Sequence, residues 1–494
     1  MKKKTNEENR QLIYQLDGRP SLHIALPLGL QHVLTMFVGN LAPVLIMAGS
    51  VSVSTGDAVV TPIQKIMMVQ CTMFVSGLAT LLQLYPIKVK GLQIGGGLPI
   101  VMGTGFVFVP TLIAAGTHYG LNAVFGAIII GSVAEMLFGI FLRPLKKFFP
   151  PVVIGCVLMT IGLNLLPVGV QYLAGGAAAQ SAADKASALL AAGEAVPADV
   201  AAAAANYGHW HNLLVGALVF ATIVCVQRFC KGFIKASAIL FGIIVGYVAA
   251  ICLGMVDFTP LLDAKIVSPP IPFFIKPEFN VSAIISIALI YVISGLETMG
   301  NVNGITVAAF NRSATANETS GAILADGIGC AFAGVFNALP NTAFGQNAGI
   351  VAMTKVVNKF CVATGAIVLL LAGFFPKIGT IFSIMPQSVL GGAVITVFGI
   401  IMINGMKLIY LDGLDDKNIL IIAITFGIGY AVSKTATLVH VLPKPLAFIF
   451  DDTTVAVCII AVLANLFFHA GEMTKKAIKA SGNDTDEVAE LDNK

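Results

Sequence analysis

Four ionisable side chains lie well inside long apolar stretches of this sequence: His32, Glu135, Glu297 and Asp326. Because a charge buried in hydrocarbon is costly, an ionisable residue at such a place is by default a candidate for function. Glu297, near the end of its apolar run, could accept two N–H donors of a heterocycle or carry a proton. Asp326, in Leu-Ala-Asp-Gly, lies nearer the middle of its run and is a second candidate proton carrier.

Each of these residues also has an interpretation without transport chemistry. Glu297 could be a carboxylate at the end of a span that reaches interfacial water. Asp326 could keep its proton in a hydrogen bond between helices, and Glu135 could face protein and be purely structural. His32 could support the scaffold of a binding site, relay protons, or be an interior histidine with no role in transport.

A polar segment interrupts the apolar pattern between Asn337 and Lys355. It combines Pro340, Gly345 and Gly349 with several uncharged polar side chains, a composition that a continuous helix does not favour. Broken, polar backbone at membrane depth persists only where protein or a water-filled cavity satisfies it. In transporters such segments point to the substrate site.

Two amides and two aromatic rings in such broken segments suit a planar ligand. The amides of Gln346 and Asn347 each offer two donors and one acceptor group. Phe106 and Phe344 could stack on a ring, or could simply pack the core. We find no nucleophile–base pattern and no metal-ligand pattern, so we expect neither an enzyme nor a metal site.

The composition is that of a polytopic membrane protein. Of the 494 residues, 57% are hydrophobic and 11% are charged, and the mean hydropathy is +0.90. Soluble domains carry about 25% charged residues. A soluble enzyme is therefore excluded, and we expect a lipid bilayer and no nucleic acid as partner.

Apolar runs near the roughly 20 residues that a helix needs to cross a bilayer predict fourteen spanning or partly spanning segments. Their limits are 22–49, 61–85, 91–110, 121–141, 150–169, 211–230, 235–256, 281–300, 319–338, 342–356, 360–376, 386–408, 417–434 and 446–468. An even number of spans places both termini on one side. With the termini inside, 22 of the 29 Lys and Arg residues lie inside, which predicts cytoplasmic termini by the positive-inside rule.

The third and tenth segments differ from ordinary spans. The third, 91–110, is rich in glycine and proline, and the tenth is the polar segment described above. Their spacing predicts two seven-span repeats, 22–256 and 281–468, and an odd number of spans in each makes the repeats inverted. Inverted repeats with broken helices are a design of secondary transporters, whose site lies near the midplane.

The polar segment resembles the signature of the nucleobase–ascorbate transporter family, also called nucleobase:cation symporter-2. The matching pattern is Gln346-Asn347-x-Gly349-x-x-x-x-Thr354-Lys355. Gln31-His32, Glu297 and Leu324-Ala325-Asp326-Gly327 occur in the family's order. The resemblance covers roughly residues 20–470 and is closest to bacterial xanthine and uric acid permeases.

The resemblance implies an all-α fold of fourteen transmembrane segments, with short antiparallel strands in segments 3 and 10 that meet in the middle of the membrane. It implies a core domain and a gate domain between two cytoplasmic tails. The expected divisions are an N-terminal tail 1–20, a core of 21–141 and 281–376, a gate of 150–256 and 386–468 with an external loop 170–210, and a C-terminal tail 469–494.

The family also implies a proton-coupled symporter that imports xanthine or uric acid by alternating access across the inner cell membrane. Members commonly dimerise through the gate domain. No cofactor is expected; H⁺ is the implied coupling ion and Na⁺ the alternative, because both can use buried carboxylates.

The family's site residues map onto this chain one by one. Glu297 matches the substrate-binding glutamate, Gln346 the motif amide and Phe106 the ring-stacking aromatic. Backbone groups around Phe106 and Gly345 would bind substrate edges, and Phe344 is a further expected contact. The residues expected in proton coupling and site support are His32, Asp326, Asn301 and Asn347.

Asn301 departs from part of the family pattern. Xanthine permeases of the family carry Asp there and uracil permeases His, whereas Asn301 can hold Glu297 by a hydrogen bond but cannot titrate. Uracil permeases carry Glu in place of Gln346, which favours a purine over uracil or another pyrimidine. An anion transporter of the same fold is a third hypothesis, but no Lys or Arg lies deep in segments 3, 8 or 10.

Overall fold

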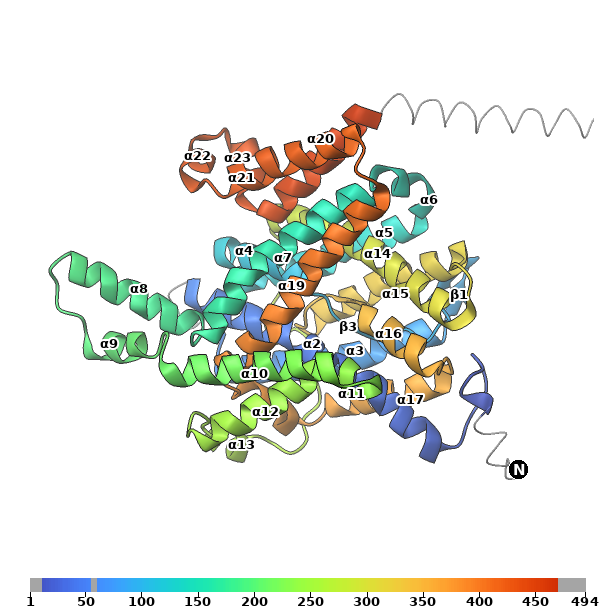
Figure 1. Ribbon diagram of the computed structural model, residues 1–494, viewed down its shortest axis with the longest axis horizontal. Coiled ribbons are helices and arrows are strands. Elements are labelled where there is room, and N and C mark those ends of the chain that lie inside the picture. The colour runs from blue at the N-terminus through green and yellow to red at the C-terminus, as the bar shows by residue number, and fades with distance from the viewer. Residues whose placement is uncertain (1–10, 55–59, 470–494) are drawn as a thin grey trace, which may run out of the picture. The chain divides into compact units, whose positions relative to one another are not determined.

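The computed structural model describes residues 11–54 and 60–469, and nearly all of its regular structure is helical (Figure 1). The predicted C-terminal tail lies outside the described residues beyond His469, and the predicted N-terminal tail is described only from residue 11. The described chain divides into two compact units. The first runs to Leu142 and includes Leu163–Ile400, and the second comprises Arg143–Gly162 and the described residues from Ile401 onward.

The first unit contains the four strands of the described chain and most of its helices. The strands are β1 Ile87–Val89, β2 Leu92–Ile94, β3 Met102–Thr104 and β4 Asn341–Ala343. The helices are α2 Leu22–Ser54, α3 Pro62–Leu84, α4 Val109–Tyr119, α5 Leu121–Ile140, α8 Ala177–Ala191, α9 Ala198–Ala205, α10 Trp210–Phe229, α11 Gly232–Ala236, α12 Ala238–Cys252, α13 Thr259–Asp263, α14 Val281–Phe310, α15 Ala316–Val335, α16 Gly345–Thr354, α17 Lys359–Ala372 and α18 Pro376–Ser383. Helices α7 Pro151–Leu173 and α19 Gln387–Asp412 contribute residues to both units.

The second unit is a small helical cluster. Its elements are the first part of α7, the last part of α19, α20 Asp416–Ile424, a π-helical turn Thr425–Tyr430, α21 Ala431–Ser433, α22 Ala436–Val441, α23 Lys444–Asp451 and a final helix Thr453–His469. Val152 and Val153 of α7 pack with Ile421 and with Ala461 and Ala464 of the final helix. This apolar contact joins segments that are far apart in the sequence.

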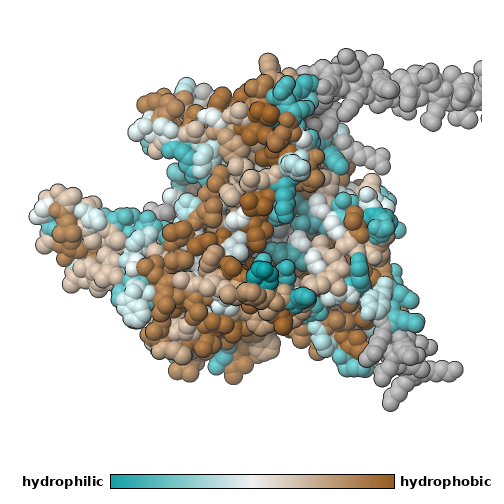
Figure 2. All heavy atoms as spheres, in the orientation of Figure 1, coloured by the Kyte–Doolittle hydropathy of each residue, from teal (hydrophilic) through white to brown (hydrophobic). Residues whose placement is uncertain are grey.

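The helices have the length and apolarity that a membrane protein needs. Eight described helices are long and apolar enough to cross a bilayer, and α17 with α18 forms a further apolar pair bent by 82°. Helices α10 and α12 expose many large apolar side chains, which form a broad hydrophobic area in Figure 2. The prediction of an all-α polytopic membrane protein is confirmed, and the count of fourteen spans stays a prediction.

The strands expected in the two broken segments are present. β3 pairs with β4 in antiparallel register, with Gly103 opposite Thr342. The hairpin of β1 and β2 was not predicted. Its two-residue turn, Lys90-Gly91, has positive φ at both positions (49° and 85°), the conformation that joins two twisted antiparallel strands most directly.

The helices differ from the predicted segments in two places. Helix α14 continues ten residues beyond the expected end of its span and stops at Asn311, which has a left-handed φ of 53°. Glu297 therefore lies in the interior of a helix, and not near its end. The expected loop 170–210 contains the end of α7 and the helices α8 and α9, since alanine has the highest helix propensity of all residues.

Helices α5, α14 and α15 pack side by side and form the framework of the site (Figure 1). Glycines let α15 approach α5 closely: a Cβ at Gly327 would lie 2.8 Å from the Met136 side chain, and one at Gly334 would lie 2.5 Å from Ile129. Small residues at helix contacts are the usual device for close packing in membranes. This approach places the middle of α5 against the middle of α15.

Candidate functional site

The pairing of β3 with β4 holds the two broken segments together. Beyond the strand pairing, the Phe344 N–H donates to the Val101 carbonyl at 2.9 Å, and the Gly105 N–H donates to the Pro340 carbonyl at 3.0 Å. All six strand residues are buried. The polar backbone that looked anomalous in an apolar sequence is therefore satisfied by the partner segment.

Helix α16 begins directly after β4. Phe344 is its N-cap residue and provides no side-chain cap, so N–H groups in the first turn, at Gly345 and Gln346, have no capping side chain. Uncapped N–H groups at the start of a helix can bind a polar or anionic edge of a ligand. This geometry supports the backbone role expected around Gly345.

The two aromatic candidates lie in different surroundings. The Phe344 ring is 6% exposed and packs over Gly39 and Gly103, where an added Cβ would lie 2.8 Å and 2.7 Å from ring atoms. The Phe106 ring is partly exposed and meets Phe398 edge-on, with ring centroids 5.7 Å apart. Phe106 is thus the more accessible stacking surface, and Phe344 is largely a packing residue.

Glu297 and Gln346 remain open. The Glu297 side chain is partly exposed and Gln346 is exposed, and neither has a hydrogen-bond or ion-pair partner among the described residues. We call these two residues the open pair. Asn301 lies about one helical turn after Glu297 on α14 and contacts the start of α16, because a Cβ at Gly345 would lie 2.8 Å from its side-chain oxygen.

His32, Asn347 and Thr298 form a contrasting bonded set, each at most 3% exposed. A His32 ring nitrogen is hydrogen-bonded to the Asn347 side-chain oxygen, and the Asn347 amide donates to the Pro99 carbonyl. These bonds join α2, α16 and the third segment. Both residues therefore fit the predicted role of site support.

Thr298 ties Asp326 to β4. Its hydroxyl donates to the Asp326 carboxyl and lies 3.2 Å from the Thr342 hydroxyl. The Asn301 amide donates to the Ala343 carbonyl at 2.6 Å. From the sequence we expected Asn301 to form a hydrogen bond with Glu297. Its amide instead reaches the Ala343 carbonyl, and so it binds the end of β4.

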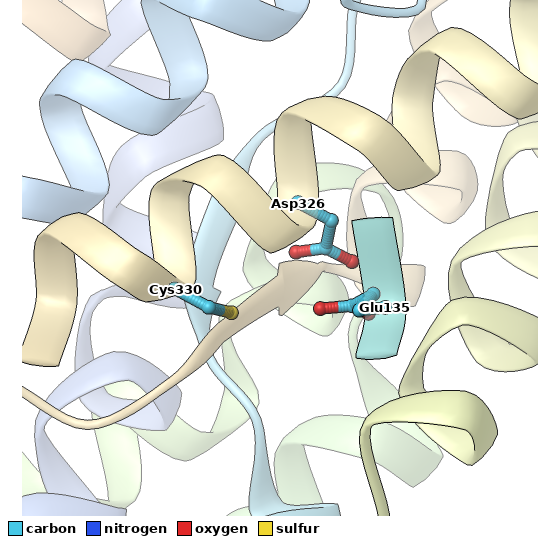
Figure 3. Close-up of side chains that lie close together, drawn as sticks. All are labelled: Glu135, Asp326 and Cys330. Carbon is cyan, nitrogen blue, oxygen red and sulfur yellow. The ribbon is translucent and has the colours of Figure 1, made fainter. Parts of the chain in front are cut away.

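Glu135 lies next to Asp326; the sequence left open whether it has a function or is purely structural. Figure 3 shows Glu135, Asp326 and Cys330 pointing toward one another, with one ligand atom from each within 4.8 Å of the others. The Cys330 thiol donates to the Asn341 carbonyl at 3.1 Å. Sequence reasoning missed Thr298 and Cys330, yet both lie one helical turn or less from a predicted carboxylate.

A second buried amide fixes β3. The Asn40 side-chain oxygen accepts the Thr104 N–H at 2.8 Å and the Ser76 hydroxyl at 2.9 Å. Ser76 also contacts the Asn341 side-chain oxygen at 3.1 Å, so β3 and β4 share this anchor. Sequence reasoning did not single out Asn40, because an uncharged residue inside an apolar run gives a weak signal.

Comparison with known proteins identifies the family. The chain matches the family model Xan_ur_permease, described as a permease family, over residues 23–198 and 188–438. It is 32% identical over 453 residues to the xanthine permease of Bacillus subtilis, covering 91% of this chain and 95% of that protein. It is also 32% identical over 443 residues to the uric acid permease PucJ of Bacillus subtilis, covering 89% and 92%.

The xanthine permease XanQ of Escherichia coli K12 is 28% identical over 479 residues, covering 94% of this chain and 96% of that protein. Among solved structures, the transmembrane domain of a cyanobacterium bicarbonate transporter, BicA, has a TM-score of 0.52 at 16% identity, covering 88% of this chain and 97% of that chain. The murine anion transporter Slc26a9 in its inward-facing state has a TM-score of 0.55 at 12% identity, covering 94% and 73%.

The similarity to these solved structures shows a shared fold. Because the sequence identities are low, it carries no information on the substrate. The sequence relatives and the family model cover most of the chain, and they agree with the signature around Gln346. This multi-pass membrane protein is therefore a transporter and not an enzyme, and it belongs to the permease family that includes the xanthine and uric acid permeases, nucleobase:cation symporter-2.

Proposed function

We propose that this permease is a proton-coupled symporter that imports an oxidised purine, xanthine or uric acid, by alternating access. The observation that carries the proposal is the open pair: Glu297 and Gln346 have no hydrogen-bond partner in the described part of the chain, whereas the neighbouring polar side chains of the bonded set are paired. Relatives named as xanthine and uric acid permeases support this substrate class.

The open pair offers complementary chemistry to a planar purine. The Glu297 carboxylate accepts two ring N–H groups, and the Gln346 amide pairs with the opposite edge through its donors and its acceptor. Hydrogen bonds to a charged group contribute roughly 1.5–3 kcal/mol each. Phe106 stacks on the ring, and the first-turn N–H groups of α16 bind a carbonyl edge.

Transport would follow from neutralisation of buried charge. Protonation near Glu297 or Asp326 would let the core, 21–141 and 281–376, move against the gate, 150–256 and 386–468, around a fixed site. The proposal includes cytoplasmic termini in the inner cell membrane, which the Lys and Arg distribution supports. It also includes a homodimer through the gate domain, as the family resemblance implies.

Uptake of radiolabelled xanthine by cells that express the full chain tests the proposal. We expect uric acid to compete and uracil not to compete, and we expect uptake to increase with an inward proton gradient. Glu297→Gln removes two charged hydrogen bonds, so uptake should fall about 100-fold or more. Glu194→Gln, a matched change at an exposed residue between α8 and α9, should behave as wild type.

Gln346→Glu tests the other half of the open pair and should change the order of competing bases. Unchanged xanthine uptake in both Glu297→Gln and Gln346→Glu would overturn the site assignment. Strong competition by uracil would instead assign a pyrimidine substrate. Large anion currents without added base would assign the anion transporter that the shared fold allows.

A further inference from the structure

Two carboxyl groups lie buried together between α5 and α15, apart from the open pair. Glu135 and Asp326 have no exposed surface, and their carboxyl oxygens approach within 4.8 Å (Figure 3). Both Glu135 oxygens and one Asp326 oxygen have no hydrogen-bond partner among the described residues. Buried polar atoms are nearly always paired, so three such oxygens in one place point to a missing ligand.

Among the described residues, no Lys, Arg or His faces these two carboxylates. Helices α5, α14 and α15 contain no Lys, Arg or His at all. The groups that face the Glu135 carboxyl are Ser294 and Glu297 from α14, and Asp326 and Cys330 from α15. Tyr291 of α14 lies beside them, and the titratable residues of α4, His118 and Tyr119, lie in its last turn, away from the buried cluster.

Two ionised carboxylates at this separation repel each other strongly in a dry interior. We propose that Glu135 and Asp326 together bind one monovalent cation, a proton or Na⁺, during each transport cycle. The proposal rests on the proposed symport function and names a second site for its coupling ion. Glu135 would contact the ion and not the purine.

The surrounding groups suit a proton better than a metal ion. The Cys330 thiol donates to the Asn341 carbonyl, and the second Asp326 oxygen accepts from Thr298. The oxygens left over are two from Glu135, one from Asp326 and the buried hydroxyl of Ser294, which faces the Glu135 carboxyl. A shared proton needs only two of these, whereas Na⁺ would require all of them together.

The carboxyl pair is connected to the substrate motif through β4. Thr298 bridges Asp326 to Thr342, and the Cys330 thiol donates to the Asn341 carbonyl, so the first two residues of the strand contact residues that surround the carboxyl pair. β4 leads directly into Phe344 and α16, which carries Gln346. Loading or emptying the pair would therefore change the contacts that hold this strand.

The test uses the full-length protein with Glu135→Gln, which keeps the side-chain volume and removes the charge. In proteoliposomes we expect equilibrium exchange of xanthine to stay within threefold of wild type, while accumulation driven by the ion gradient falls at least tenfold. Exchange needs substrate binding but no net ion movement, so a merely structural defect would lower both. Glu318→Gln, a carboxyl-to-amide change in the same helix as Asp326 but outside the pair, is the control.

Thermal stability of the purified protein reports ion binding without any substrate. The wild-type melting temperature should fall as pH rises, because removal of the proton restores the repulsion, and Glu135→Gln should flatten this dependence. Stabilisation by Na⁺ in wild type alone would identify Na⁺ as the ion. Equal pH and Na⁺ responses in wild type and Glu135→Gln, with normal accumulation, would overturn the proposal.

Two further measurements keep the outcomes separate. If Glu135→Gln does not reach the membrane, Glu135→Asp, which retains a carboxyl group, should shift the pH at which the melting temperature changes; an unshifted value would contradict the proposal. If wild type transports no purine, the proposed function fails, while the melting experiment still decides on the ion site.

Discussion

The open pair and the bonded set differ in how far the fold has used their hydrogen-bonding capacity. Glu297 and Gln346 keep accessible surface and have no partner among the described residues. His32, Asn347 and Thr298 are almost fully buried and are bonded across helices. The two groups are adjacent in the chain, since Gln346 precedes Asn347 and Glu297 precedes Thr298.

Helical geometry explains this sharp difference between neighbours, since both pairs lie in helices. Consecutive residues of a helix point about 100° apart, so one faces the packed interior and the next faces away. In the proposed site, each residue of the open pair is therefore followed in the sequence by a residue of the bonded set. The difference teaches that pairing, and not polarity, separates the proposed substrate contacts from the proposed supports.

The adjacent amides provide the largest expected contrast in stability. Asn347→Ala leaves a His32 ring nitrogen and the Pro99 carbonyl buried without a partner, and each unsatisfied group costs about 1–3 kcal/mol. Gln346→Ala changes an exposed side chain and should alter stability by no more than about 0.5 kcal/mol. The melting temperature of both variants measures this, and equal values would show that the two amides are not distinguished by pairing.

Much of the open pair could be predicted from the sequence because its signal is local. Pro340, Gly345 and Gly349 interrupt an apolar pattern, and Gln346 lies inside the interruption. The two broken segments could be recognised in the same way, whereas the pairing of β3 with β4 was expected only from the family resemblance. Such features depend on neighbouring residues and on the cost of unsatisfied backbone in a membrane.

The partners of the buried groups could not be predicted, because they depend on tertiary packing. Glu135 meets Asp326 only because glycines of α15 let α5 approach closely. The length of α14 was underestimated since Gly300, Asn301 and Asn303 lower its hydropathy, although Asn301 faces protein and bonds to Ala343. Hydropathy measures compatibility with lipid and is uninformative about residues that contact only protein.

Asn301 lies between the two groups in character, being bonded yet partly exposed, and should give an intermediate effect. Asn301→Ala removes its 2.6 Å bond to the Ala343 carbonyl. Because water can reach this position, the expected cost is about 0.5–1.5 kcal/mol, measured as a lower melting temperature. A cost as large as that of Asn347→Ala would place Asn301 in the bonded set.

The pH dependence of uptake by Asn301→Asp tests the importance of the hydrogen bond to Ala343. A carboxylate cannot donate to the Ala343 carbonyl, whereas a protonated carboxyl group can. Uptake by this variant should therefore approach wild type at low pH and decline relative to wild type as pH rises. A constant ratio between variant and wild type across pH would show that the bond to Ala343 is unimportant.

A small effect is also expected where a polar network is complete but open to water. At the start of α15, Glu318 pairs with Arg312 at 2.6 Å and forms a capping box with Thr315. Glu318→Gln retains the box, as glutamine serves there equally, and loses only the ion pair, which at an exposed position is worth at most about 1 kcal/mol. The difference in melting temperature from wild type should shrink in high salt, because ions screen exposed charges. A salt-insensitive loss as large as that of Asn347→Ala would mean that burial is not what makes the bonded set costly to disrupt.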